Sequence, residues 1–174
     1  MRLALSCACA LFAALLGGCV ATTGSTVSTA GAGAGIVEGV LDSINEARRD
    51  GHDCASGHYP ATEPLTIDAR LTEAAQQHAE DLADRRTLSH RGADGSDPFE
   101  RMEAAGYRFA NAAENVAEGQ QTPRAVVDAW LASRTGHCDN VMDSVYRHMG
   151  VGMAQVERDG RVVRYWVLKV GREL

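Results

Sequence analysis

The sequence predicts one domain of the α+β class. Its 174 residues, 45% hydrophobic and 23% charged, are enough for one buried core and too few to expect two. Apolar residues recur at helical spacing in four segments between residues 36 and 133. Two extended runs, residues 150–156 and 162–170, then follow near the C-terminus. Helices followed by antiparallel strands are typical of a layered α+β domain.

The first nineteen residues are expected to be a signal peptide. Arg2 precedes an apolar run over residues 3–16, which is too short to span a bilayer as a mature helix. Leu16-Gly17-Gly18-Cys19 resembles the bacterial lipobox, so we expect Cys19 to become a lipid-modified N-terminus that anchors the chain to a membrane. The alternative is ordinary cleavage after Cys19-Val20-Ala21, which would release a secreted or periplasmic protein.

Residues 20–36 are predicted to form a flexible linker. Residues 20–35 are only Ala, Gly, Ser, Thr and Val, without charge or periodicity. Such a composition buries too little apolar surface to offset the entropy of ordering. The folded domain is therefore expected to cover residues 37–174.

The cysteine count predicts one disulfide. Of five cysteines, two lie in the signal peptide and a third is Cys19, which leaves Cys54 and Cys138 in an oxidising compartment. A bridge between them would restrict the unfolded chain by roughly 4.5 kcal/mol and would hold the segment of His137. The alternatives are two buried free thiols, or Cys138 as a metal ligand, which is less favoured because the adjacent His137 points in another direction.

The first helix is predicted over residues 36–51 and ends at Gly51. Its apolar face comprises Val37, Val40, Leu41, Ile44 and Ala47. A loop is expected next. It contains His52, Cys54, His58 and Pro60, and its histidines are expected to face water.

Asp68 is predicted to cap a second helix that ends after Thr87. Its apolar stripe comprises Leu71, Ala74, Ala75, His78 and Leu82. His78 is therefore expected to be a buried, hydrogen-bonded core histidine, with metal ligation as the alternative. His90 falls in the loop that follows.

Asp97-Pro98-Phe99-Glu100 combines an N-cap, a first-turn proline and a third-position glutamate, which predicts a short helix ending at Gly106. Residues 113–117 are expected to form a short strand that carries Glu114. Thr122-Pro123 opens another helix, and Asp159-Gly160 predicts a two-residue hairpin turn between the last two strands. The side chains of the helix after Thr122 that are expected to face the core are Val126, Val127 and Trp130.

The charge pattern disfavours nucleic acid as a partner. The net charge is −6, no basic block occurs, and the only lysine, Lys169, lies within an apolar run. Phosphate binding needs a clustered positive face. We therefore expect no nucleic-acid partner.

His90, Glu114 and His137 are the candidate functional residues. Each stands beside a small or turn-forming residue, which suggests separate elements converging on one pocket. Ser89 and Ser133, near the two histidines, would mimic nucleophiles, but capping of loops is the favoured role for both. No His-Glu-x-x-His or Gly-x-Ser-x-Gly motif is present, so the hydrolytic machinery is poor.

The chain resembles a known family in seven motifs that occur in order between residues 38 and 171. These are Asn45-Glu46-Ala47-Arg48 with Pro64-Leu65, Ala74-Ala75-Gln76-Gln77-His78-Ala79, Leu88-Ser89-His90, Ala113-Glu114-Asn115-Val116-Ala117, Trp130-Leu131-Ala132-Ser133, Gly136-His137 and Gly150-Val151-Gly152. They resemble the cysteine-rich secretory protein, antigen 5 and pathogenesis-related superfamily, the CAP or SCP-like domain, in its bacterial form. The resemblance implies a three-layer α-β-α sandwich around a small antiparallel sheet, an extracellular location and a central cleft.

In many members that cleft holds two histidines and two glutamates. By resemblance, His90 and His137 match the histidines, and Glu114, which Asn115 follows, matches one glutamate. Ser133 stands where the second glutamate would follow the tryptophan, so the tetrad is incomplete. Lys169 lies in an apolar run where a polar Thr-Gln pair is often found.

The resemblance favours an extracellular binding module whose cleft takes a small ligand or lipid. One alternative is a weak metal-dependent hydrolase, in which His90 and His137 hold Zn²⁺ and Glu114 is the candidate base. Another is a cell-envelope interaction protein, in which these residues with Asn115 form a purely structural polar core. No cofactor other than Zn²⁺ in the cleft is expected, and the sequence assigns no oligomeric state.

Overall fold

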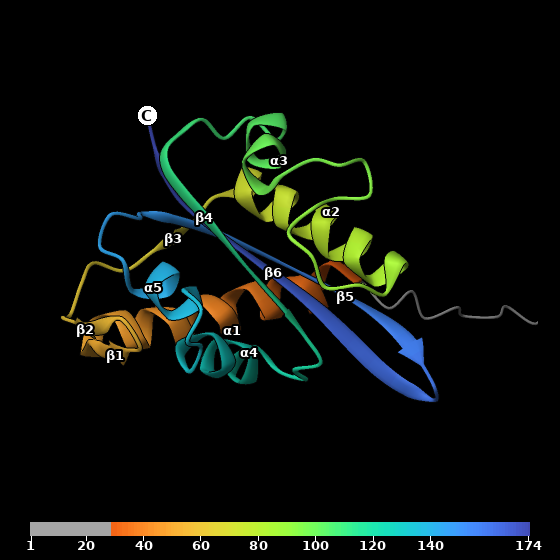
Figure 1. Cartoon of the computed structure of the whole chain (residues 1–174), viewed down its shortest axis with the longest axis horizontal. Coiled ribbons are helices and arrows are strands. Elements are labelled where there is room, and N and C mark those ends of the chain that lie inside the picture. The colour runs from red at the N-terminus through yellow and green to blue at the C-terminus, as the bar shows by residue number, and fades with distance from the viewer. Residues whose placement is uncertain (1–28) are drawn as a thin grey trace, which may run out of the picture.

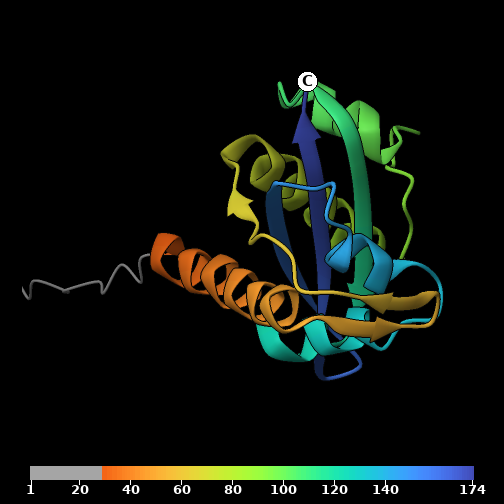
Figure 2. The same ribbon diagram turned by 90° about the vertical axis from the view of Figure 1, so that its left-hand side faces the viewer.

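The computed structural model describes residues 29–174, and the side chains from Gly35 onward (Figures 1 and 2). The predicted signal peptide, the lipobox with Cys19 and linker residues 20–28 lie outside the described residues.

The first helix, α1 (Thr29–Asp50), begins earlier than expected. Residues 29–36, predicted as part of a flexible linker, are helical, and in Figure 2 this end of the helix extends away from the rest of the domain. A helix nucleated by a packed segment extends by one hydrogen bond for each residue that it orders, and alanine favours this extension. The sequence pattern missed these turns because their composition lacks apolar periodicity.

A four-stranded sheet forms the middle layer. It contains β3 (Thr66–Ile67), β4 (Phe109–Glu118), β5 (His148–Arg158) and β6 (Arg161–Glu173). The spatial order is β3-β5-β6-β4, so β4 is an edge strand. The two long pairings are antiparallel, but β3 runs parallel to β5, which makes the sheet mixed rather than the antiparallel one expected. At the predicted turn between β5 and β6, Asp159 and Gly160 both have positive φ, 52° and 72°, as a two-residue type I′ turn requires.

Helices cover both faces of this sheet (Figure 1). One face carries α2 (Ala69–Arg85) and α3 (Pro98–Ala104), and the other carries α1, α4 (Pro123–Leu131) and α5 (His137–Met142). Separate apolar clusters fill the two interfaces. The structure thus confirms the three-layer α+β architecture.

The predicted helix starts are present. Asp68 caps α2 through Arg70 N at 2.9 Å, and Asp97 with Glu100 forms the capping box of α3. Thr122 Oγ1 accepts from Ala125 N at 3.1 Å and caps α4. Local sequence therefore determines where these three helices begin.

The segment predicted as a loop after α1 forms a small hairpin instead. Strands β1 (His52–Cys54) and β2 (Gly57–Tyr59) pair antiparallel. These strands are three residues long and largely exposed, so they lack the apolar alternation by which a sequence reveals a strand. His58 is exposed, as expected, and contacts Asp53 at 2.7 Å.

Two glycines set the distance between α2 and the sheet. A Cβ atom at Gly150 would overlap the backbone of α2 at Leu71 and Thr72, and one at Gly152 would overlap it at Ala75 and Gln76. These positions of β5 therefore need glycine for close approach. The helix that carries His78 consequently lies directly on the sheet.

Two long-range links secure α5. The predicted disulfide between Cys54 and Cys138 is present, with their Cα atoms 5.7 Å apart, and joins the β1–β2 hairpin to α5. At the other end of α5, the buried Arg48 donates to the carbonyls of Val141 and Asp143 at 2.8 and 3.0 Å. Burial, and then the charge of Arg147, lowers the pKa of Arg48 to about 10, so it stays protonated at neutral pH.

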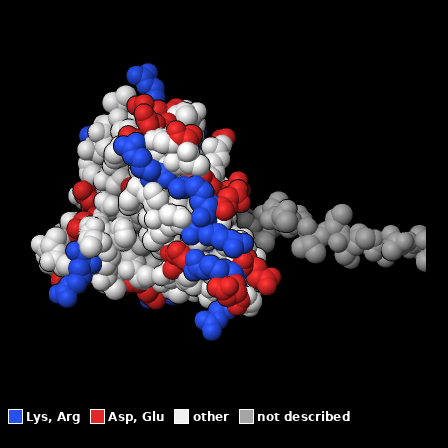
Figure 3. Space-filling view, turned by 45° about the vertical axis from the view of Figure 1, so that its right-hand side comes forward, with Lys and Arg blue, Asp and Glu red and all other residues white. Residues whose placement is uncertain are grey.

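Basic side chains form a band on one face of the molecule. Figure 3 shows acidic side chains on both sides of this band. Within residues 29–174, no helix combines the length and apolar character needed to cross a bilayer.

Candidate polar cleft at strand β4

Glu114 is the centre of a buried polar cluster. It lies on β4 opposite Lys169 of β6, and its side chain is 1% exposed. Its carboxylate accepts from Lys169 Nζ at 2.6 Å, from His90 Nδ1 at 2.8 Å and from Arg101 Nη2 at 3.1 Å. Lys169 Nζ also donates to Pro98 O at 3.2 Å. The cluster therefore links the sheet, α3 and the loop after α2.

These contacts keep Glu114 ionised. Burial alone would raise the pKa of Glu114, but the hydrogen bond from His90 and the charges of Lys169 and Arg101 lower it to about 2. Burial also lowers the pKa of Lys169, and the carboxylate opposes that change. The side chain of Glu114 is thus a fixed anion with its oxygens already occupied.

The next residue of β4, Asn115, contacts the helical layer on the opposite face of the sheet. Successive side chains of a strand point to opposite faces, and Asn115 accordingly faces α5. Its Nδ2 donates to His137 O at 2.9 Å, and its Oδ1 accepts from Asn140 Nδ2 at 2.8 Å. Asn115 thereby fixes the backbone of the first turn of α5.

The two histidines converge at the edge strand. His90 comes from the loop after α2 and is half exposed, whereas His137 opens α5 on the other layer and is half-buried. Burial lowers the pKa of His137, and the nearby His90 lowers it further. The two imidazoles thus lie close enough for their charges to interact, although they come from opposite sides of the sheet.

Neither candidate serine hydroxyl is hydrogen-bonded to an imidazole. Ser89 Oγ accepts from Arg91 N at 2.9 Å, and Ser133 Oγ accepts from Thr135 N at 3.2 Å. Both contacts are local side chain to backbone bonds that shape a loop. Ser133, which the resemblance aligns with the family's second glutamate, is half-buried.

His78 is buried, as expected. Its side chain is 0% exposed, and Nε2 lies 2.9 Å from Ser89 O. It therefore supports the loop that carries His90.

Sequence reasoning missed Arg101 and Lys169 as partners of Glu114. A lysine inside an apolar strand was the available signal, because a buried ammonium group needs a nearby carboxylate. Arg101 gave no comparable signal, since an arginine on a short helix is usually solvated.

Few side chains at this site are available to bind a metal ion. His90 has Nε2 free of Glu114, and His137 offers a second imidazole, but the Glu114 carboxylate is taken by cations. Among residues 29–174, no group of three or more His, Cys, Asp or Glu side chains is arranged to hold a metal ion. The described residues therefore do not fit the three protein ligands typical of catalytic zinc.

Two Bacillus subtilis proteins are similar in sequence. The uncharacterized protein YkwD is 36% identical over 92 residues, which cover 53% of this chain and 35% of YkwD. The uncharacterized membrane protein YlbC is 29% identical over 102 residues, which cover 59% of this chain and 29% of YlbC. The chain thus aligns with about a third of each relative's length.

Solved structures share the fold. An extracellular protein with an SCP domain from Bacillus anthracis superposes with a TM-score of 0.65 at 21% identity, covering 81% of this chain and 41% of that one. An outer surface protein from Borrelia burgdorferi gives a TM-score of 0.60 at 22% identity, with coverage of 78% and 90%. Residues 41–170 match the cysteine-rich secretory protein family, CAP. With this match over most of its length, the chain belongs to the CAP family, as its motifs predicted.

Proposed function

We propose that the protein is an exported CAP-domain binding module whose cleft takes a small ligand between His90 and His137. The expected signal peptide supports export. The names of two relatives of the same fold, an extracellular protein and an outer surface protein, also support it. Lipid anchoring through Cys19 belongs to the same proposal.

The observation that carries the proposal is that hydrogen bonds hold the imidazole of His90 and the backbone of His137. Glu114 holds Nδ1 of His90 at 2.8 Å, which leaves Nε2 directed away from the carboxylate. Asn115 holds the backbone of His137 at 2.9 Å from the other side. Pre-organised polar groups bind a ligand without a further ordering cost.

The same contacts favour binding over hydrolysis. A general base works best with a pKa near the working pH, whereas the pKa of Glu114 is about 2. Its two oxygens are also occupied by three donors. Glu114 is therefore a positioning group rather than a base.

Exposed apolar side chains favour an amphipathic ligand. Leu88, two residues before His90, is 45% exposed, and Phe99 is 43% exposed. Phe99 follows Pro98, whose carbonyl accepts from Lys169 of the cluster. A lipid-like molecule with a polar head would place its head between the imidazoles and its tail on these side chains.

A second candidate is weak zinc binding. In metal sites a carboxylate commonly holds one nitrogen of a histidine and orients the other toward the metal, and Glu114 holds Nδ1 of His90 in this way. Two imidazoles alone imply affinity of about micromolar order or weaker.

The test is a calorimetric titration of the full chain with monomeric dodecanoate and, separately, with zinc. His90→Ala and His137→Ala should each weaken dodecanoate binding about tenfold or more. His58→Ala, which removes an exposed histidine of the β1–β2 hairpin, should leave it unchanged.

Tight one-to-one zinc binding that both cleft variants abolish would favour the metal site instead. Failure of both probes to bind, together with loss of stability in both cleft variants, would make the histidines structural and refute the binding proposal.

A further inference from the structure

Five arginines follow one another in a row from the loop after α2 to the β5–β6 turn. Arg85 is the last residue of α2, and its Nη2 donates to the carbonyl of Arg91 in the loop at 2.8 Å. Arg86 follows Arg85 in the chain, and Arg158 and Arg161 lie opposite one another on β5 and β6. We call these five residues the arginine row.

The side chain of Tyr165 joins the two halves of the arginine row. Burial and the charge of Glu118 raise the pKa of Tyr165, whereas the charges of Arg158 and Arg86 lower it. Both guanidinium groups therefore lie near the same tyrosine, one from the end of α2 and the other from β5. The row thus passes from the helical layer to the end of the sheet, and Figure 3 shows basic side chains gathered in a band of this kind.

The arginine row concentrates positive charge on a molecule whose formal net charge is −6. Two of its arginines are bound by carboxylates, Arg85 by Asp81 and Arg158 by Glu118, both at 2.6 Å. The other three are exposed and have no carboxylate partner among the residues that the structure describes. Three positive charges along the row are therefore left to attract an anion.

Arg86 has a backbone conformation that usually belongs to glycine. It ends α2 with φ 53° and ψ 40°, in the left-handed region. Helices commonly place glycine at such an end, because a side chain there strains the backbone. Strain that persists in a folded protein often marks a functional site. An exposed arginine in this conformation therefore points to a role beyond ending the helix.

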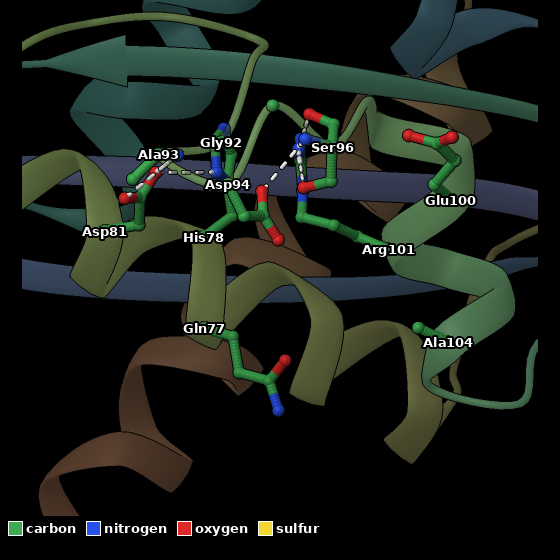
Figure 4. A pocket seen from close by; sticks show the side chains of 11 residues that line it. Gln77, His78, Asp81, Gly92, Ala93, Asp94, Ser96, Glu100, Arg101 and Ala104 are labelled. Atoms are coloured by element: carbon green, nitrogen blue, oxygen red, sulfur yellow. Dashed lines mark hydrogen bonds and ion pairs between the residues drawn. The ribbon is translucent and has the colours of Figure 1, made fainter.

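The loop that carries Arg91 is held in place. The carboxylate of Asp81 accepts from Ala93 N at 3.3 Å, as the dashed lines in Figure 4 show. Arg91 Nη1 donates to Gly95 O at 2.7 Å. A guanidinium group has five N–H donors, so most of those of Arg91 stay available. Donors that are already positioned bind a partner at a lower entropic cost.

The distribution of charge favours a linear polyanion over a flat anionic surface. Acidic side chains lie on both sides of the basic band in Figure 3. A flat surface would bring these carboxylates against its own negative charge, whereas a narrow chain would contact the arginines alone. Guanidinium groups bind phosphate through paired N–H donors, so phosphate suits a row made only of arginine. Tyr165 is buried and offers no surface on which nucleic acid bases would stack.

We propose that the arginine row binds a linear polymer whose units are joined by phosphate groups, such as a glycerol phosphate chain of a cell envelope. Each phosphate would pair with one or two guanidinium groups along the row. The polymer would thereby hold the exported protein at an anionic envelope. The proposal uses none of the contacts of Glu114 or Asn115, so it is independent of a ligand in the cleft.

The test measures binding of fluorescent poly(glycerol phosphate) to the full chain by fluorescence anisotropy, at about 50 mM salt and above. Arg161→Gln should weaken binding about threefold or more, and should lower the slope of log affinity against log salt by about 0.7. Arg172→Gln is the matched control, because Arg172 is an exposed arginine near the opposite end of the same strand, β6. It should leave the slope unchanged.

Arg86→Gly separates binding from folding. Glycine suits the left-handed conformation, so the urea midpoint of this variant should stay the same or rise. Its affinity for the polymer should nonetheless fall about threefold or more. If Arg86 served only to stabilise the C-terminus of α2 by its charge, the variant would lose stability and keep its affinity, which would contradict the proposal.

Three further results would overturn the proposal. No saturable binding of the polymer, or equal losses in Arg161→Gln and Arg172→Gln, would mean that the arginine row is not the binding surface. Tighter binding to phosphatidylglycerol vesicles at equal phosphate concentration would make a flat membrane the partner. Equal or tighter binding of a single-stranded thymidine oligonucleotide would make nucleic acid the partner. Failure of the protein to bind dodecanoate in the cleft would leave these measurements unaffected.

Discussion

On the face of the sheet covered by α2 and α3, β4 contributes a buried carboxylate, Glu114, held by three donors. On the opposite face its next residue, Asn115, contributes a neutral amide with two bonds. Charges removed from water must be compensated in full, whereas an amide loses only its own hydrogen bonds. Loss of any one partner of Glu114 should therefore destabilise the α2/α3 face. The stability of the α5 face depends instead on contacts between residues far apart in sequence, namely the disulfide and the bonds of Arg48.

The largest expected effect is on the α5 face. Replacing Cys54 and Cys138 by serine should lower the free energy of unfolding by about 4.5 kcal/mol, because 84 residues separate them. Urea unfolding measures the loss. Dithiothreitol should destabilise the parent and leave the double variant unchanged; a loss below about 1 kcal/mol would show that Arg48 alone secures α5.

Glu114→Gln should cost about 4 kcal/mol, because Lys169 would be left buried without its carboxylate. Glu118→Gln is the matched control, since Glu118 lies on the same strand and pairs with Arg158 near the surface. Its expected cost is below about 1 kcal/mol. Adding Lys169→Met to Glu114→Gln should recover much of the loss. Equal costs for Glu114 and Glu118 would remove the contrast between buried and exposed pairs.

Acid should weaken the charged face first. The pKa of Glu114 is about 2 in the folded protein against 4.5 ordinarily, so its contribution is present above pH 4.5 and is lost as the pH falls toward 2. The difference corresponds to about 3 kcal/mol. Urea midpoints measured between neutral pH and about pH 2 should fall more steeply for the parent than for Glu114→Gln. Parallel slopes would contradict the ion-paired state of Glu114.

Asn115→Ala should cost about 2 kcal/mol and act locally, because it removes the bonds to His137 O and Asn140. Hydrogen exchange should rise in the first turn of α5 while α2 stays protected. Asn111→Ala, a half-buried position on the same strand, serves as the control and should cost less than about 0.5 kcal/mol. Faster exchange across both layers would mean that the two faces are not independent.

Local patterns predicted the features that local chemistry determines. The caps Asp68, Asp97 and Thr122 and the Asp159-Gly160 turn are each specified by a few neighbouring residues. The disulfide followed from counting cysteines. Strand β3 and the β1–β2 hairpin were missed because two or three mostly exposed residues show no period. Helix α5, six residues long, is stabilised by Arg48 and Cys54, which are distant in sequence.

The candidate site likewise has features that the sequence predicted and features that it did not. Sequence placed His90, Glu114 and His137 near one another through motif order. It did not pair Glu114 with Lys169, because that contact depends on the register between β4 and β6. Register is a property of the assembled sheet rather than of either strand.

Arg48 has a consequence for the order in which the molecule folds. Its bonds to the carbonyls of Val141 and Asp143 span 93 and 95 residues. Contacts this distant in sequence form only after most of the chain has collapsed, and topologies rich in them fold slowly. The corner that holds α5 is thus expected to assemble late, and His137 with it. Until then a newly made chain would present its sheet without the second imidazole.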